Sequence, residues 1–271
     1  MPVEARAEAC CRLKSSAPDV YRSLEISPMK KYLGSLLVLC SASYSAFAAH
    51  PLVTDDTGTQ GKGNNQVEVN TDWLRQSGVG SHVGAFTYTY GATDNLDVFT
   101  NAPASFYPSA GVGDVSVGAK WRFADRNGGS LAIKPEFFLP SGNESKGLGN
   151  GRSSLALTQI ASYADGPWTF HANIGVTINR YGTADDEAAN RPVVWRASTA
   201  VWYAINAQWK IVADTGVAQN IARSSDVNPS FVLLGAIYSP NESVDLDVGA
   251  KVGLNKAEVG QQFGVGATFH F

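Results

Sequence analysis

The chain ends with Gly260-Gln-Gln-Phe-Gly-Val-Gly-Ala-Thr-Phe-His-Phe271, and this stretch decides the fold. In an extended strand, alternate side chains point to opposite sides. One side of this stretch is therefore apolar, with Phe263, Val265, Ala267, Phe269 and Phe271. A half-buried strand of a soluble sandwich shows the same alternation, but it rarely ends the polypeptide on an exposed aromatic residue. The pattern predicts a strand with one apolar face that ends together with the chain.

A terminal Phe preceded by alternating apolar residues resembles the assembly signal of bacterial outer-membrane β-barrels. On this resemblance, the five apolar residues of the stretch are expected to face lipid and to serve as the assembly signal. Phe271 would then lie at the periplasmic rim, and the last strand would close the barrel against the first.

The beginning of the chain predicts export. Met29-Lys-Lys is followed by an apolar core from Tyr32 to Cys40 and by the small-residue pattern Ala46-x-Ala48, the layout of a secretory signal peptide. We predict a signal peptide over 29–49, with cleavage after Ala48 or Ala49. Residues 1–28 do not fit in front of a signal peptide, and we interpret them as a non-native extension, with translation starting at Met29.

Composition excludes several classes of function. Cys10, Cys11 and Cys40 all precede the predicted cleavage site, so the mature chain would have no disulfide, thiolate metal site or cysteine nucleophile. The formal net charge is −3 and there is no basic cluster, which argues against nucleic acid as a partner. After Ala49 no apolar run is long enough for a membrane helix, which needs about 20 residues. The apolar residues alternate with polar ones instead, as in a membrane barrel.

The fold class predicted from this pattern is all-β: a single antiparallel up-and-down transmembrane β-barrel of about 12 strands over 66–271. Each strand has roughly the ten residues that cross the hydrocarbon layer when tilted. Pro135 interrupts one of them, and we expect a bulge there because a closed barrel has no edge strand to accommodate a proline. The predicted strands are 66–75, 81–92, 96–102, 113–124, 130–139, 153–164, 168–180, 194–205, 208–220, 230–239, 244–254 and 260–271.

The connections between these strands alternate in length along the whole chain. Those after even-numbered strands are short and rich in turn-forming Asn, Asp, Gly and Pro: 93–95, 125–129, 165–167, 206–207 and 240–243. Several on the opposite side are long and polar: 103–112, 140–152, 181–193 and 221–229. This predicts short periplasmic turns and longer extracellular loops.

Aromatic residues cluster toward the ends of the predicted strands, which predicts the two interfacial girdles of a membrane barrel. The expected periplasmic girdle consists of Tyr90, Trp121, Phe123, Tyr163, Trp168, Trp209, Tyr238, Phe269 and Phe271. The expected outer girdle consists of Trp73, Phe137, Tyr181, Trp195, Phe231 and Phe263. The strand at 230–239 does not fit a simple pattern, because it is apolar on both faces.

The polar register of the strands defines candidate lumen-lining residues. Acidic and basic side chains are nearly balanced among them, so we expect ion pairs inside the barrel and weak ion selectivity. The candidates are Glu68, Asp72, Asp97, Asp114, Lys120, Arg122, Lys134, Glu136, His171, Arg196, Lys210, Asp214, Asp245, Asp247 and Lys251.

Catalysis is the main alternative to transport, because a barrel hydrolase would need a Ser and a His within hydrogen-bond reach on one face. The histidines after the predicted cleavage site are His50, His82, His171 and His270, and no recognisable motif places a serine with His171 or His270 on a lipid-facing register. No pair of these residues has the spacing of a metal site. We therefore expect no enzyme activity, no cofactor and no metal.

Several segments together resemble the outer-membrane transporter family "putative MetA-pathway of phenol degradation". They are His50-Pro-Leu-Val-Thr-Asp-Asp-Thr-Gly-Thr-Gln-Gly-Lys-Gly63, Val67-Glu68, Gly113-Asp-Val-Ser-Val-Gly-Ala-Lys-Trp-Arg-Phe123, Leu139-Pro-Ser-Gly142 and Asn173-Ile-Gly175. The similarity spans nearly all of 50–271. It implies a barrel that takes up aromatic or hydrophobic compounds, while nothing in this sequence by itself identifies phenol.

The polar, Gly-rich stretch before the first strand has two interpretations. Residues 50–65 could form a lumen plug, with Asp55 and Asp56 pairing with lumen Lys or Arg, or a loose periplasmic tail.

The function expected from the sequence is passive uptake of small solutes through an integral outer-membrane channel. The alternatives are an outer-membrane lipid-modifying hydrolase and a structural or sensory barrel without transport. Expected partners are outer-membrane lipid and lipopolysaccharide, the barrel-assembly machinery, periplasmic chaperones and a small solute that the sequence does not identify. The oligomeric state stays open.

Overall fold

The computed structural model describes residues 50–271. The predicted extension at 1–28 and the predicted signal peptide at 29–49 lie outside the described residues. Within 50–271, no helix is both long and apolar enough to cross a membrane.

Twelve long strands and one very short strand, β4, form almost all of the regular structure of residues 50–271. A 3-10 turn, η1 (Glu144–Lys146), and a short helix, α2 (Ala184–Ala189), lie in connecting loops. The strands are β1 (Asn65–Gln76), β2 (Val79–Thr93), β3 (Leu96–Tyr107), β4 (Gly111–Val112), β5 (Ser116–Arg126), β6 (Gly129–Phe138), β7 (Ser154–Asp165), β8 (Trp168–Ile178), β9 (Val193–Ala204), β10 (Trp209–Ala218), β11 (Ser230–Asn241), β12 (Val244–Gly253) and β13 (Gln261–His270).

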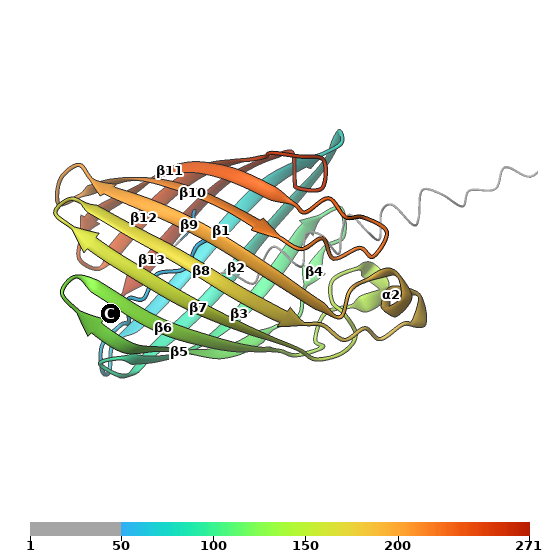
Figure 1. Ribbon diagram of the computed structural model, residues 1–271, viewed down its shortest axis with the longest axis horizontal. Coiled ribbons are helices and arrows are strands. Elements are labelled where there is room, and N and C mark those ends of the chain that lie inside the picture. Colours follow the sequence, from blue (N-terminus) through green and yellow to red (C-terminus); the bar gives the residue numbers. More distant parts are fainter. Residues whose placement is uncertain (1–49) are drawn as a thin grey trace, which may run out of the picture.

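The long strands close into a barrel (Figure 1). Each pairs antiparallel with its neighbours in sequence, and β4 only folds back on the end of β3. The last strand pairs with the first in one unbroken register from Gln66↔His270 to Arg75↔Gln261. The predicted twelve-stranded antiparallel barrel, closed by the C-terminal strand, is confirmed.

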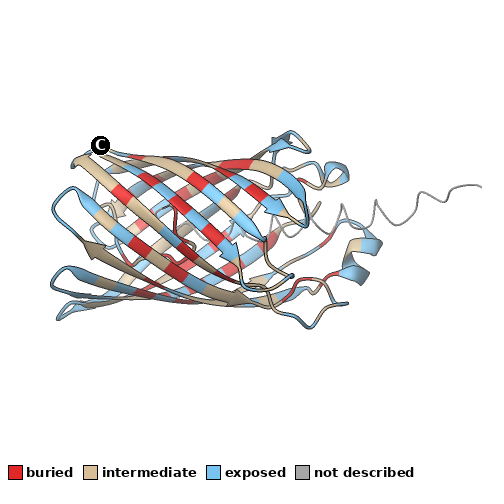
Figure 2. Ribbon diagram, turned by 90° about the horizontal axis from the view of Figure 1, so that it is seen from above, coloured by how far each residue is buried: buried red, intermediate tan, exposed pale blue. Residues whose placement is uncertain are grey.

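Burial alternates along the strands and separates two faces (Figure 2). On β1, Val69 and Trp73 are both 47% exposed, whereas Glu68 and Asp72 are buried. Because successive side chains of a strand point to opposite sides, the exposed apolar face is the outer wall and the buried polar face is the lumen. The chain has placed its carboxylates inside and its large apolar side chains outside, as a lipid environment requires.

Short and long connections lie at opposite ends of the barrel, as the sequence predicted. One end carries the tight turns 94–95, 127–128, 166–167, 205–208 and 242–243, together with the C-terminus (Figure 1). The other end carries the longer loops 108–115, 139–153, 179–192, 219–229 and 254–260, with α2 among them. The two-residue turn at 77–78 is the short connection at this long-loop end.

Two details of the strands differ from the prediction. Strand β3 extends to Tyr107, well beyond residue 102, because its outer half continues to pair with β2. The expected bulge at Pro135 is wrong. Pro135 stays in the unbroken β6–β7 ladder, opposite Leu157, and the β5–β6 ladder keeps its register across it. The β5–β6 register shifts elsewhere, between Arg122 and Ala124.

The aromatic girdles are largely placed as expected, but two members are wrong. Trp73 and Trp168 are 47% and 44% exposed on the outer wall, as interfacial residues should be. Tyr181 and Phe231 are both only 6% exposed. Tyr181 belongs to a long loop, where its hydroxyl donates to the carbonyl of Arg191. Phe231 points into the lumen and packs in an apolar cluster there, so the assignment of both to the lipid interface fails.

Candidate functional site: the barrel lumen and its plug

Residues 50–64 lie inside the barrel and form what we term the plug segment. The segment lacks the alternating apolar residues of a strand, so its backbone polar groups are paired by lumen side chains instead. It runs from His50 within the lumen to the short-turn end, where the Gly63 amide donates to the carbonyl of Gly91 at 2.8 Å. The structure thus places this stretch in the lumen.

The plug begins with His50, whose imidazole lies between two carboxylates. Its Nδ1 bonds the carboxylate of Asp247 on β12, and its Nε2 lies 3.5 Å from Oδ1 of Asp72 on β1. Burial alone would lower the pKa of His50, but the hydrogen bonds to Asp247 and Asp72 and their negative charges outweigh it and raise the pKa to about 10. The imidazole is therefore a cation at neutral pH and anchors the plug electrostatically.

The next anchor of the plug along the chain is an apolar contact. Leu52 is 4% exposed and belongs to a buried lumen cluster with Ala200, Val212, Phe231, Leu233 and Ile237. This explains why the strand at 230–239 is apolar on both faces: its outer face meets lipid, and its inner face receives the plug. Burying a Leu side chain contributes about 1.5–3 kcal/mol.

Asp214 on β10 holds the backbone of the plug. Its Oδ2 accepts from the amides of Val53 at 2.6 Å and Thr54 at 2.8 Å, and its Oδ1 accepts from the Thr54 hydroxyl at 2.6 Å. A carboxylate that accepts several hydrogen bonds is well compensated for its burial. Asp214 therefore holds the plug in place by accepting hydrogen bonds from backbone amides that belong to no strand ladder.

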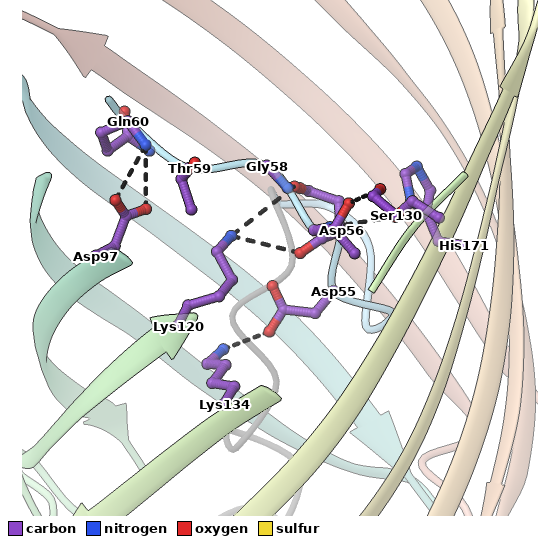
Figure 3. A network of polar contacts seen from close by, with 12 residues as sticks. Asp55, Asp56, Gly58, Thr59, Gln60, Asp97, Lys120, Ser130, Lys134 and His171 are labelled. Atoms are coloured by element: carbon purple, nitrogen blue, oxygen red, sulfur yellow. Dashed lines mark hydrogen bonds and ion pairs between the residues drawn. The ribbon is translucent and has the colours of Figure 1, made fainter. Parts of the chain in front are cut away.

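Two ion pairs join the middle of the plug to the opposite wall (Figure 3). Asp55 pairs with Lys134 on β6, and both side chains are nearly fully buried, at 3% and 4% exposed. Asp56 Oδ1 lies 3.8 Å from Lys120 Nζ on β5. Burial would raise the pKa of Asp56, but the ammonium of Lys120 leads the contributions that outweigh it and lower the pKa. Both carboxylates are paired as the plug interpretation of the sequence requires.

The last part of the plug is held by neutral contacts and one acid. The hydroxyls of Thr57 and Ser130 lie 2.5 Å apart, and the Thr57 amide donates to Ser162 Oγ at 3.1 Å. Further along, the Gln60 amide donates to both oxygens of Asp97, at 3.1 Å each. The plug is thus bonded to strands all around the barrel rather than to one wall.

The structure brings together one serine–histidine pair that the sequence analysis did not identify. Ser162 on β7 and His171 on β8 are cross-strand partners, and Ser162 Oγ lies 2.8 Å from His171 Nδ1. The pair faces the lumen, with His171 only 3% exposed, and the Thr57 amide already donates to the serine oxygen. His171 Nε2 has no hydrogen-bond partner within 50–271.

Beyond the plug, the long-loop half of the lumen contains a cavity of about 230 Å³. Val53 of the plug and Leu148 of the loop 139–153 both line it. Most other side chains of its wall are apolar or small, among them Leu74, Val83, Phe138, Val217, Ile221 and Phe231.

The charged groups that line this cavity are paired. Lys251 Nζ lies 3.1 Å from Glu258 Oε1, and it also lies over the ring of Phe231 at 5.2 Å. Asp114 accepts from the backbone amides of Gly142 and Asn150, both at 2.9 Å. Arg196 also lines the cavity, and its guanidinium group donates to Thr158 Oγ1 at 2.9 Å. The cavity is therefore a largely apolar chamber whose few charged side chains all bond protein atoms.

The candidate lumen residues fall into two groups in the structure. Those that bond the plug directly are Asp72, Asp97, Lys120, Lys134, Asp214 and Asp247. The others bond within the wall or the loops: Glu68 with Asn70, Asp114 with loop amides, Arg122 with Asp125, Glu136 with Ser116, His171 with Ser162, Arg196 with Thr158, Asp245 with His270, Lys251 with Glu258, and Lys210 over the ring of Trp202.

Sequence reasoning missed the glycines that make room for the plug. Gly249 and Gly235 face Pro51, and a Cβ atom at Gly235 would lie 2.6 Å from its Cγ. A Cβ at Gly264 would lie 2.7 Å from Nε2 of His50. The available signal was weak but present, since these glycines occupy the lumen register of their strands, where a larger side chain would otherwise help to fill the bore.

The residues proposed as an assembly signal lie on β13 or directly after it. Three of them face outward, with Phe263, Phe269 and Phe271 exposed by 49%, 43% and 67%. Val265 and Ala267 are of intermediate exposure in the same register. The outward face of the last strand is thus apolar, and its role in assembly stays a prediction.

The sequence matches the family model "Putative MetA-pathway of phenol degradation" over residues 48–271. This match covers most of the chain, so the protein belongs to that family. No protein in a search of curated sequences matches it.

Several solved outer-membrane barrels have a similar fold. One is the COG4313 outer membrane channel from Pseudomonas putida F1, which is 15% identical, with a TM-score of 0.63 over 80% of this chain and 98% of that one. The NanC porin is 12% identical, with a TM-score of 0.59 over 75% and 98% of the two chains. The KdgM porin is 6% identical, with a TM-score of 0.56 over 76% and 99%. At these identities the likeness shows the fold, which is that of outer-membrane proteins.

Proposed function

We propose that this protein is an outer-membrane channel for the passive uptake of small solutes of aromatic or hydrophobic character. The observation that carries the proposal is the apolar cavity in the long-loop half of the lumen, directly above the plug. In an outer-membrane barrel the longer loops face the outside of the cell and the short turns face the periplasm. A solute that arrives from outside would therefore meet this chamber before it meets the plug.

The character of the chamber supports a neutral, largely apolar solute. Ligand sites are typically lined by apolar side chains with a few placed polar groups, and this wall has that composition. Because Lys251 and Asp114 are compensated by Glu258 and by loop amides, they have little charge to offer a solute. The family description, which names phenol degradation, and the channel or porin descriptions of the similar structures support the same direction.

Passage to the periplasm requires the plug to shift. The segment makes contacts to β1, β3, β5, β6, β7, β10 and β12, so its described position crosses the bore. Much of this attachment is polar and could be exchanged for water. We propose that the plug loosens in part during transport while the wall, held by continuous ladders, stays closed.

Uptake into liposomes tests the proposal. Vesicles that contain the protein should take up a small neutral aromatic compound faster than a sugar of similar mass. Changing Leu148→Asp in the chamber should slow the aromatic compound while leaving the sugar unchanged. Leu254→Asp is the matched control, because Leu254 is 60% exposed and does not line the chamber. Equal rates for the two solutes, or no effect of Leu148→Asp, would contradict the proposed solute class.

A second candidate function, lipid or ester hydrolysis, rests on the Ser162–His171 pair alone. The pair has nucleophile and base within reach, but the plug occupies the serine oxygen and the pair faces the lumen rather than lipid. A serine-reactive phosphonate probe on the intact protein and on a variant lacking 52–63 decides between the functions. Labelling that Ser162→Ala removes would favour the hydrolase, and absence of labelling together with solute uptake would favour the channel.

A further inference from the structure

Three glycines form a row across the lumen wall beneath the start of the plug. The strand registers pair Gly264 on β13 with Gly249 on β12, and Gly249 with Gly235 on β11, so the row crosses three adjacent strands. Asp72 on β1 pairs with Gly264 at the end of the row. With no side chains in the way, His50 and Pro51 lie directly against the backbone there. We call this row, with Gly266 beside it, the glycine socket.

Acidic residues surround the socket and outnumber the cations there. Glu68, Asp72 and Asp247 are at most 8% exposed. Asp72 and Asp247 share the single imidazole of His50, and no Lys or Arg within 50–271 lies in ion-pair distance of any of the three. Among the described residues, Glu68 accepts from the side-chain amide of Asn70 alone, at 3.2 Å. Burying several carboxylates against one cation is costly, and a second positive charge beside them would reduce that cost.

The start of the mature chain can supply that charge. The sequence predicts cleavage after Ala48 or Ala49, which leaves a new α-ammonium group on His50 or on the residue before it. The imidazole of His50 bonds Asp247 and lies 3.5 Å from Asp72, so an ammonium group on His50 itself would be one side chain's length from these carboxylates. A chain that begins one residue earlier would add at most about 3.3–3.6 Å to that reach. An uncut leader would instead carry a neutral peptide bond at this position.

We infer that the α-ammonium group created by signal-peptide cleavage binds to the acidic cluster of Glu68, Asp72 and Asp247 and locks the head of the plug in the glycine socket. In this arrangement, processing does more than release the chain from the export machinery. It creates the cation that completes a buried charge network, and it thereby ties the closed state of the lumen to maturation. The ligand of this site is the protein's own amino terminus.

The first test determines where the mature chain begins. Intact mass of the protein purified from outer membranes should correspond to a first residue of Ala49 or His50. A chain that begins at Met1, at Met29 or beyond His50 would overturn the inference, because no ammonium would then lie at the socket.

The second test measures the charge itself in the wild-type protein. The α-amine is tagged by reductive methylation with ¹³C-formaldehyde, and the methyl signals are followed by NMR while the pH is varied, in the folded and the heat-unfolded protein. Burial alone lowers the pKa of an amine, whereas carboxylate partners raise it. A folded-state pKa above that of the unfolded chain is expected, and a pKa at or below it would overturn the inference.

Variants then assign the partners. Glu68→Gln should lower the pKa of the terminal amine and so speed its acylation near neutral pH, about tenfold for each unit of pKa lost. Glu136→Gln is the matched control, since Glu136 is also a buried lumen carboxyl but bonds Ser116, away from the cluster. Inserting Ser-Gly between Ala49 and His50 moves the terminal amine away from the cluster while His50 and Pro51 stay in the socket. The amine should then be acylated as fast as in unfolded protein. Equal reactivity of all these proteins would contradict the assigned partners.

Discussion

The two halves of the lumen are built in opposite ways. The half near the short turns is filled by the plug segment, many of whose polar groups have a partner on the wall, such as Lys134 for Asp55 and Asp214 for Thr54. The half near the long loops is a chamber lined mainly by apolar side chains, where Lys251 pairs with Glu258 and Asp114 accepts from loop amides. In the channel proposed above, the first arrangement would resist flow and the second would admit a solute. Selectivity and closure would then be carried by separate parts of one bore.

The largest change in conductance should come from removing the plug, which abolishes the difference between the two halves. Deleting 52–63 empties the filled half and leaves the barrel wall intact, because the wall ladders do not include these residues. Single-channel conductance in planar bilayers should rise several-fold. The folded barrel should still show heat-modifiable mobility on a gel, which serves as the control. Unchanged conductance would mean that the plug segment does not limit flow.

Breaking one buried ion pair should give the next largest effect. Asp55→Ala leaves the ammonium of Lys134 without this carboxylate, and loss of one partner of a buried pair typically costs about 3–5 kcal/mol. The plug should loosen, with conductance between that of the wild type and that of the deletion, and Asp55→Ala/Lys134→Ala should recover part of the loss. Asp226→Ala, at the exposed Arg191–Asp226 pair, is the control and should leave conductance unchanged. A single variant that conducts like wild type would show that this pair does not hold the plug.

A smaller change in conductance should come from the titration of His50. Its pKa is raised from 6.5 in the unfolded state to about 10 in the folded state, so its contribution to docking of the plug is complete below pH 6.5 and is lost as the pH rises to about 10. The groups that face the imidazole are the carboxylates of Asp72 and Asp247, with Glu68 nearby.

Conductance measured from pH 6 to pH 10.5 should therefore rise, and His50→Asn should flatten the part of the profile due to the imidazole. An amino terminus bound as inferred above would titrate in the same range. The wild type and His50→Asn should therefore be compared by the difference of their profiles. A difference that does not vary with pH would exclude His50 as a titrating anchor.

The smallest effect on conductance should come from the outer wall. Removing Phe271, which is 67% exposed at the end of β13, changes neither half of the lumen. We expect less assembled protein in the outer membrane, while each assembled channel conducts as in the wild type. Leu254→Asp, a change of one exposed residue far from the C-terminus, is the control for assembly. Normal assembly without Phe271 would show that the C-terminal aromatic residue is not required.

The fold could be predicted because its signals are local. Alternating apolar residues give the strands and their faces, and turn residues such as Asp165-Gly-Pro167 mark the tight connections. The failures are equally specific. Pro135 was expected to force a bulge, yet the register holds across it. Phe231 was assigned to the lipid interface because a strand that is apolar on both faces does not reveal which face is inside.

For the candidate site, the sequence predicted which residues face the lumen but not the contacts between them. The lumen register identified residues such as Lys120, Lys134 and Asp214 as inward-facing, but not which of them meets which part of the plug. The Ser162–His171 pair was missed because it depends on the register between two strands, not on a motif in either. The glycine socket was missed for the same reason, since the row of glycines exists only once three strands are aligned.

By itself, the sequence determined an antiparallel membrane barrel with an apolar outside, a charged inside and loops of unequal length at its two ends. These properties depend on residues close together in the chain. Only the tertiary structure decided that 50–64 lies within the bore and that His50 reaches Asp247, 197 residues away. The physical reason is that closure of the barrel and the registers of all its strands fix which distant side chains share the lumen, and a polar segment takes its conformation from those partners.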